Sequence, residues 1–412
     1  MAMSTLIMPM SLGKGPFSYR PFRRITLARS ISALGSWMQT IAAGWLVFHL
    51  SGSAMDVGVL AALATGPSLI GTPIGGMLAD RYCPRKLAIG LSWAQTASPA
   101  LLAVLAFADE LTVPLIFLLI FLGAIPNALR SPIIAVVVPF TVPQQLRHAA
   151  VADGSAAYNI SVFAGAVLGG AAVQLIGVGA AFAVNAISFA CVALVLMQSP
   201  VLQPACDMAR NRHDASLVVG LKQGWPLDFV RTVAYGAAIF FVLIAPIQQL
   251  MPTIAAQHGE GAMLLGVLLG AMFAGGLLAN HFVRRWVTDG PSGERALTLA
   301  VLVSAIPTLL LGFSRTLPTD ILLLVVIGFC WELVFVSSQS TLQLDVPVDI
   351  RGRMIGLLFT LVSGGAALGA LAVGYLFQKL GVDYGLLVCG AAVAICGTAI
   401  TLRRLRRAQP RA

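Results

Sequence analysis

Two charged side chains lie inside long apolar runs of the sequence, and their types suit chemistry. Arg130 and Glu332 each have more than ten uncharged residues on both sides. A charge at membrane depth costs about 2.5–3.5 kcal/mol on insertion scales, so such residues mark proton relays or substrate contacts. We therefore expect Glu332 to be a protonatable coupling group. We expect Arg130 to bind an anionic substrate group or to modulate the protonation of Glu332.

These charged residues also have a structural interpretation. Arg130 and Glu332 would form an ion pair across a shared cavity, or Arg130 would extend its guanidinium toward the membrane surface. A third charged residue, Asp153, lies near an expected helix start, where the helix dipole favours an acidic side chain. Its functional alternative is a second proton carrier.

Uncharged polar and aromatic side chains at the same depth complete the candidate site. Amides inside membrane helices either bridge helices or face a watery cavity. Trp331, next to Glu332, is the candidate for stacking against a substrate, and its alternative is core packing. The amides expected to line the cavity are Gln39, Asn159, Gln248 and Gln339.

The composition indicates a polytopic membrane protein. Of 412 residues, 58% are hydrophobic and only 10% are charged, whereas soluble domains carry about 25% charged residues. The formal charge of +10 comes from short basic clusters between apolar runs. Because these clusters form no continuous stripe, we expect no nucleic-acid partner. Membrane lipids and a small-molecule substrate are the expected partners.

No residue pattern predicts an enzyme or a metal centre. The six cysteines contain no CxxC pair, and the five histidines are scattered without ligand spacing. We therefore expect neither a metal nor a disulfide framework. The sequence has no GxxxxGK[ST] motif and no nucleophile with its base, so it has no ATP site of its own. We expect no cofactor.

Twelve apolar runs are long enough to cross a bilayer as helices, which takes about 20 residues. They lie at about 26–50, 54–79, 86–108, 112–141, 151–176, 178–198, 228–254, 262–284, 295–314, 318–344, 353–379 and 382–402.

The basic residues predict the orientation. If the N-terminus is cytoplasmic, all but three of the 26 Lys and Arg residues lie in inner loops and tails, the exceptions being Arg130, Arg315 and Lys379. The positive-inside rule then puts both termini in the cytoplasm of a multi-pass protein of the inner or plasma membrane. The predicted units are a cytoplasmic tail (1–20), a six-helix bundle (21–198), a polar linker (199–227), a second six-helix bundle (228–403) and a basic tail (404–412).

The two bundles contain a repeated loop. GGMLADRYCPRK begins at Gly75, and GGLLANHFVRRW begins 200 residues later at Gly275. Four helices also carry glycines four residues apart, a spacing that lets helices approach closely. We expect these four helices to form the seam at which the halves rock. The pairs are Gly71 and Gly75, Gly165 and Gly169, Gly266 and Gly270, and Gly365 and Gly369.

These features together resemble the major facilitator superfamily over residues 20–404. The first loop is similar to the signature G-x-L-A-D-R with following basic residues between helices 2 and 3 of that superfamily. The matching residues are Gly76, Leu78, Ala79, Asp80, Arg81, Arg85 and Lys86. A closer resemblance is to its enterobactin-exporter and macrolide-efflux branch. Leu342-Gln343, Val346-Pro347 and Arg351-Gly352-Arg353 match L-Q-x-x-V-P-x-x-x-R-G-R of that branch after helix 10.

The resemblance implies an all-α fold of twelve transmembrane helices in two pseudo-symmetric six-helix bundles, usually monomeric. It implies a cytoplasmic gating loop of Gly76, Asp80, Arg81, Arg85, Lys86, Arg351 and Arg353. Asp80 would pair with a basic group or cap a helix across the seam. The implied activity is export of a siderophore, macrolide or other small amphipathic compound, driven by the proton gradient. The alternatives are a lysophospholipid or nutrient carrier of the same fold, or a membrane receptor or scaffold that does not transport.

Overall fold

The computed structural model describes residues 15–137, 141–199, 225, 227–259, 261–286 and 290–408. Within these residues all regular secondary structure is helical. Most of the predicted tails and linker lies outside the described residues, so the domain boundaries stay predictions. The first half contains α1 (Arg20–Ser51), α2 (Ala54–Thr65), α3 (Ser68–Arg81), α4 (Pro84–Phe107), α5 (Val113–Val137) and α6 (Arg147–Met197). The second half contains α9 (Asp228–Leu243), α10 (Pro246–Gln249), α11 (Met251–Ala255), α12 (Ala262–Trp286), α13 (Gly290–Phe313), α14 (Leu317–Asp345), α15 (Val348–Leu380) and α16 (Val382–Ala408), with short 3₁₀ turns at Pro16–Ser18, Gln144–Leu146 and Ala256–His258.

The predicted all-helical polytopic fold is confirmed. Eleven helical segments of the described chain are long and apolar enough to cross a membrane. One of them, within α6, is twice the needed length and turns back at Gly177, whose φ of 82° and ψ of 167° are not helical. A glycine adopts this backbone without the Cβ clash that other residues meet. Counted on both sides of Gly177, the spans number twelve, as predicted.

Two of the spans are broken by proline. In the second span, α2 ends at Thr65 and α3 begins at Ser68, and Gly66 and Pro67 lie between the two helices. The seventh span is divided into α9, α10 and α11, with Pro246 and Pro252 opening the second and third pieces. Proline lacks the backbone N–H that would continue the hydrogen-bond ladder, so each break follows from the sequence.

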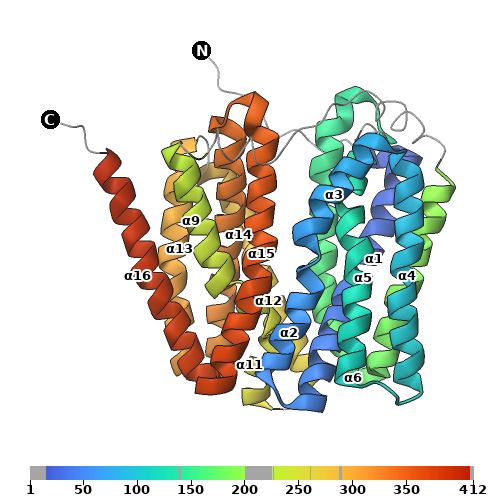
Figure 1. The fold of residues 1–412 in the computed structure, drawn as a ribbon, viewed down its shortest axis with the longest axis horizontal. Helices are drawn as coiled ribbons and strands as arrows, with labels where there is room; N and C mark the ends of the chain where they lie inside the picture. Colours follow the sequence, from blue (N-terminus) through green and yellow to red (C-terminus); the bar gives the residue numbers. More distant parts are fainter. Residues whose placement is uncertain are drawn as a thin grey trace.

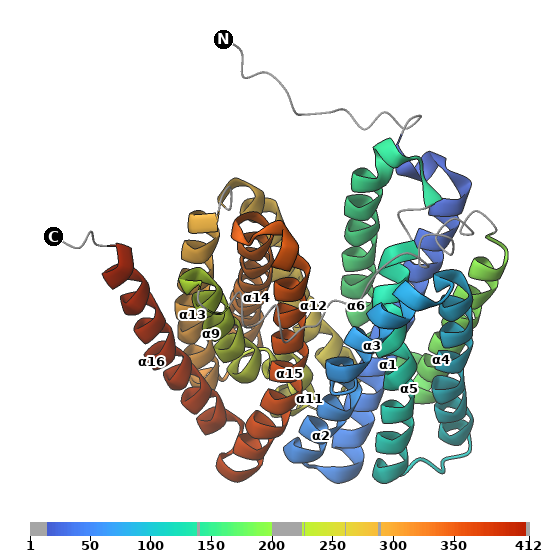
Figure 2. The ribbon, with the colours of Figure 1, turned by 45° about the horizontal axis from the view of Figure 1, so that its top comes forward.

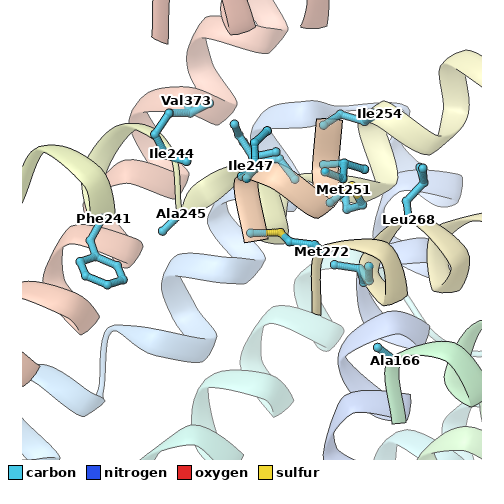
Figure 3. Close-up of a cluster of buried hydrophobic side chains, with 14 of the residues drawn as sticks. Ala166, Phe241, Ile244, Ala245, Ile247, Met251, Ile254, Leu268, Met272 and Val373 are labelled. Carbon is cyan, nitrogen blue, oxygen red and sulfur yellow. The ribbon is translucent and has the colours of Figure 1, made fainter. Parts of the chain in front are cut away.

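The helices form two bundles that lie side by side. In Figures 1 and 2, α1–α6 make one bundle and α9–α16 the other, and the start of α1 lies at the same end of the molecule as the end of α16. One core of buried apolar side chains extends through both bundles. Figure 3 shows its centre, where Ile247 and Met251 of the broken seventh span lie among Leu268 and Met272 of α12 and Val373 of α15.

The bundles touch closely at the end remote from the termini. A Cβ built on Gly58 of α2 would lie 2.4 Å from the carbonyl oxygen of Ala370 in α15. In the second helix contact between the bundles, a Cβ built on Gly170 of α6 would lie 2.5 Å from the carbonyl oxygen of Ala262 in α12. Such distances require bare backbone on both sides of the seam. The backbone N–H of Ala54 also donates to Oε1 of Gln378 across the seam at 3.0 Å.

The four spans that carry the glycine pairs form the seam, as predicted, because α2 and α3 contact α15 and α6 contacts α12. Only one of the four glycine pairs lies in the contact between the bundles. Gly266 and Gly270 of α12 face Ala166 and Val167 of α6, across the seam. The other three pairs pack helices inside one bundle: Gly71 and Gly75 face α5, Gly165 and Gly169 face α1, and Gly365 and Gly369 face α9. The spacing predicts close approach but does not identify the partner helix, so the seam helices are as predicted while three of the glycine pairs pack within a bundle.

The repeated loop corresponds to a repeated contact. A Cβ on Gly75 would lie 2.2 Å from the carbonyl oxygen of Leu129 in α5, and one on Gly275 would lie 1.9 Å from that of Val325 in α14. Equivalent glycines thus bring equivalent helices together in each half. This repeated packing gives the fold its internal pseudo-symmetry.

Candidate functional site

A cavity of about 850 Å³ lies between the two bundles. Its volume falls within the usual range of about 300–1,000 Å³ for small-molecule sites. Helices α1, α2, α4, α5 and α6 contribute to one wall, and α10, α11, α12 and α14 contribute to the other. The charged side chains among its described lining residues are Arg29, Arg130 and Glu332.

Most of the residues predicted to form the site line this cavity, on one wall or the other. Arg130 and Glu332 are joined there by Gln39, Asn159, Gln248 and Gln339. Trp331 is not among the lining residues. Its ring packs behind Phe335, which does line the cavity, with the ring centroids 5.7 Å apart. Asp153 is likewise not among the described lining residues.

Helix α1 presents a polar stripe to the cavity. Arg29, Ser32, Ser36 and Gln39 recur every three or four residues, as the helical repeat of 3.6 residues requires, and they line the cavity together with Thr40. The helix begins at Arg20, nine residues before Arg29, so Arg29 lies about 13 Å along the helix axis. Arg29 is therefore not an inner-loop residue, as the sequence analysis assumed, but part of the site.

The first-half wall is organised by hydrogen bonds between side chains. Nδ2 of Asn185 in α6 donates to Oε1 of Gln39 in α1 at 2.7 Å. Nε2 of Gln95 in α4 donates to Oδ1 of Asn127 in α5 at 3.0 Å. Pairs of this kind satisfy polar groups inside a membrane-spanning helix bundle. One of these bonds joins α6 to α1, and the other joins α4 to α5.

Glu332 occupies the opposite wall, and its partner comes from the repeated loop. Nδ2 of Asn280, the residue that stands where the first copy has Asp80, donates to Oε1 of Glu332 at 2.9 Å. Among the described residues no ion pair joins Glu332 to Arg130. The predicted structural ion pair is therefore not present in this conformation, and the carboxyl group is held by an amide alone.

The gating loop makes a contact inside the first bundle. The guanidinium of Arg85 donates to the backbone carbonyl oxygens of Met197, at 2.7 Å, and of Leu196, at 3.4 Å. These carbonyls belong to the last turn of α6, where a cation is favoured by the helix dipole. Cys83, in the same loop, is disulfide-bonded, although one such bond is not the disulfide framework that the sequence analysis did not expect. The side chains of Asp80, Arg351 and Arg353 lie outside the description, and their expected gating contacts stay predictions.

A second polar cluster closes the remote end of the second bundle. Nε2 of His258 lies 2.5 Å from Oδ2 of the buried Asp320 at the start of α14. Asp383 at the start of α16 pairs with Arg315 at 2.8 Å and accepts a hydrogen bond from Gln257 at 2.7 Å. These contacts tie the loop after the seventh span to two other helices.

Comparison with known proteins identifies the family. The model of the family described as transmembrane secretion effector matches residues 12–411, nearly the whole chain. The chain belongs to this family. Among the relatives of this family member, the multidrug efflux pump Tap of Mycolicibacterium fortuitum is 25% identical, with 94% of this chain and 96% of the relative covered. Macrolide efflux protein A of Streptococcus pyogenes is 21% identical, with 91% and 93% covered. The efflux branch of the major facilitator superfamily, which the loops resemble, is thereby confirmed.

Solved structures agree with the fold of this secretion effector family member. A POT family transporter in complex with 5-aminolevulinic acid superposes with a TM-score of 0.72 at 14% identity, covering 95% of this chain and 97% of that one. An inward-facing, unoccupied bacterial homologue of the lysosomal transporter Spinster superposes with a TM-score of 0.68 at 15% identity, covering 95% and 97%. Family and fold together make this chain a multi-pass membrane transporter and not an enzyme.

Three residues of the site were missed by sequence reasoning, and each had a weak signal. The polar stripe of α1 includes Arg29 at the helical repeat. Asn185 is an amide in the sixth span, which was not expected to line the cavity. Asn280 occupies the acidic position of the repeated loop, but its partner Glu332 lies 52 residues away in sequence and only the fold brings them together.

Proposed function

We propose that this secretion effector family member exports a small amphipathic compound across the plasma membrane by proton-coupled alternating access. The efflux activities in the names of its relatives support export. A cavity walled by both bundles supports alternating access, because transporters of this kind bind cargo at the interface of their repeats and rock around it. Proton coupling rests on Glu332.

The orientation proposed is with both termini in the cytoplasm. The distribution of basic residues supports it. The cavity then lies on the cytoplasmic side of the seam contacts made by Gly58 and Gly266. In this orientation the conformation corresponds to the inward-facing state, in which an exporter takes up its cargo.

The observation that carries the proposal is the chemical setting of Glu332. It is the acidic side chain among the described lining residues of the cavity. It accepts one hydrogen bond, from Asn280, and forms no ion pair among the described residues. A carboxyl group without a cationic partner can gain and lose a proton as the cavity changes its exposure, which is what a coupling group must do.

The experiment uses everted membrane vesicles from an efflux-deficient bacterium that expresses the full chain. Respiration establishes a pH gradient, and siderophores, macrolides and cationic dyes are added while the gradient is followed by fluorescence. We expect at least one compound to discharge the gradient with the wild type but not with Glu332→Gln. Asp109→Asn, a conservative change of an exposed acid outside the cavity, is the matched control.

Two other results would count against the proposal. If Glu332→Gln discharges the gradient as well as the wild type while Asp153→Asn does not, the coupling group is Asp153. If no compound on the panel discharges the gradient with the wild type, although the protein is present in the membrane, proton-coupled export is refuted for these compound classes.

A further inference from the structure

A pair of arginines lies on the first-half wall of the cavity, and only one of them, Arg130, was expected there from the sequence. Arg29 comes from α1, Arg130 from α5 and Tyr158 from α6, and all three line the cavity. Arg130 lies close enough to Arg29 and Tyr158 to interact with both electrostatically, and Arg29 also interacts with Tyr158. Three helices thus bring two guanidinium groups and one phenol to the same place.

No acidic side chain of the described chain neutralises these two charges. Neither arginine takes part in an ion pair there. Nε of Arg130 is buried and has no hydrogen-bond partner. The acid on the cavity wall, Glu332, belongs to the opposite bundle and is held by Asn280. Two like charges at membrane depth without a counter-charge are costly, and such residues are kept where they meet a ligand.

The surroundings of Arg130 present its guanidinium to the cavity. The ring of Phe189 lies 5.7 Å from the guanidinium carbon, a cation–π contact that holds the group on one side. A guanidinium offers two parallel N–H donors that match the two oxygens of a carboxylate or phosphate. The hydroxyl of Tyr158 is a further donor on the same wall.

An apolar patch on the opposite wall suits an apolar body, beside the polar side chains of Glu332, Gln248 and Gln339 on that wall. The residues of this patch are Leu265, Leu269, Phe335 and Val336. A ligand that fills both parts therefore has an acidic head toward the first bundle and an apolar body toward the second. This division is a property of the side chains on each wall and does not depend on the direction of transport.

We infer that Arg29, Arg130 and Tyr158 form a subsite for an oxyanion, carboxylate or phosphate, carried by an amphipathic molecule. The inference rests on the proposed function in one respect, that the molecule bound in this cavity is the cargo. It makes acidic amphiphiles the preferred substrate class. Neutral and purely cationic compounds are expected to bind more weakly.

The test is direct binding to the full chain, purified in a neutral detergent, without any gradient. The probes are dansyl-labelled undecanoic acid and its methyl ester, which differ in the negative charge and little else. We expect the acid to bind more tightly than the ester by roughly tenfold to a hundredfold, the range for a charge-assisted hydrogen bond. Arg29→Gln and Arg130→Gln should each weaken binding of the acid by about tenfold or more and leave the ester unchanged.

The controls separate binding from folding. Arg315→Gln removes an exposed arginine at the remote end of the molecule and should change neither affinity. Arg130→Lys keeps the positive charge but not the paired N–H donors of the guanidinium, so it should bind the acid more tightly than Arg130→Gln and less tightly than the wild type. Because Arg130 has no protein partner for Nε, Arg130→Gln should not lower the melting temperature of the ligand-free protein.

The chemical identity of the oxyanion follows from competition. Dodecanoic acid and lauroyl lysophosphatidic acid are compared as displacers of the labelled acid, and the stronger one identifies a carboxylate or a phosphate head group. Displacement by either supports the subsite.

The inference is overturned if the acid and the ester bind equally, or if the arginine variants weaken both to the same extent. It is also overturned if Arg130→Gln melts at a markedly lower temperature and loses both ligands, because Arg130 would then be structural. Charge-selective binding with no proton movement in vesicles would leave the subsite intact and refute the proposed function. Proton-coupled export of neutral compounds, with no preference for the acid, would support the proposed function and refute the subsite.

Discussion

The seam at the remote end is a contact between helix backbones, and one methyl group at Gly58 tests whether that contact maintains the observed conformation. In Gly58→Ala the new Cβ would lie 2.4 Å from the carbonyl oxygen of Ala370 and 3.2 Å from its carbon. Ordinary contact begins at about 3.4 Å, so α2 and α15 must separate by roughly 1 Å. Backbone atoms cannot rotate away as a flexible side chain could.

The size of the effect follows from the cost of overpacking. Inserting a methylene into a well-packed contact costs about 1–3 kcal/mol. The alternative conformation, in which the remote end opens, does not bear this cost. The equilibrium between the two conformations should therefore shift by roughly 5- to 150-fold toward the open remote end.

The measurement is the distance between spin labels on Leu50 and Leu380, two exposed positions at the remote end of the two bundles. With Gly58→Ala we expect a second, longer distance that is weak or absent in the parent protein. Gly76→Ala is the matched control, because a Cβ there meets no atom within 4 Å. If the distance distributions of Gly58→Ala, Gly76→Ala and the parent coincide, close packing at Gly58 does not set the conformation and the reasoning is wrong.

Three further substitutions test local features of the fold and the site. Gly177→Ala should lower the melting temperature because its positive φ costs a side chain about 1–2 kcal/mol, whereas Gly154→Ala, in the helical part of the same element, should not; equal melting of the two would contradict the strain argument. Asn280→Asp puts a second acid beside Glu332, so it should lower the stability of the protein and reduce transport at neutral pH by about tenfold or more. The double variant Asn280→Asp with Glu332→Gln restores an acid–amide pair, so it should recover stability but not proton coupling. Asp320→Ala leaves the imidazole of His258 without its partner and should cost about 1–3 kcal/mol, measured as a lower melting temperature; an unchanged value would show that the contact contributes nothing.

The fold was largely predictable because the bilayer imposes a length and a composition on each span. Ten of the twelve apolar runs correspond to separate helical segments, and the other two meet at Gly177, between runs predicted to end at 176 and to begin at 178. The breaks at Pro67 and Pro246 follow from local chemistry. What the spacing of glycines could not supply was the partner of each helix face. Gly71 meets α5 and Gly266 meets α6, although both carry the same spacing.

The site was predictable where a single residue is unusual for its surroundings. Arg130 and Glu332 stand out as charges in apolar runs, and both line the cavity. Arg29 does not stand out, since it follows a basic helix start and resembles a loop residue until the helix boundary is known. Asn280 acquires its role only through a contact 52 residues away. An unusual residue type at one position can be recognised from the sequence, whereas a contact between two distant residues is known only from the fold.

The unequal walls of the cavity bear on how such a protein changes over generations. The two halves share a repeated loop, yet one wall carries the arginines and the amide network and the other carries Glu332, several glutamines and an apolar patch. On the roles proposed for these residues, substitution of the arginines in the first half would alter which head group is accepted, and substitution of Glu332 in the second half would alter the response to the proton gradient. Because the two proposed roles lie on different walls, the head-group preference could change while the proposed coupling group is kept.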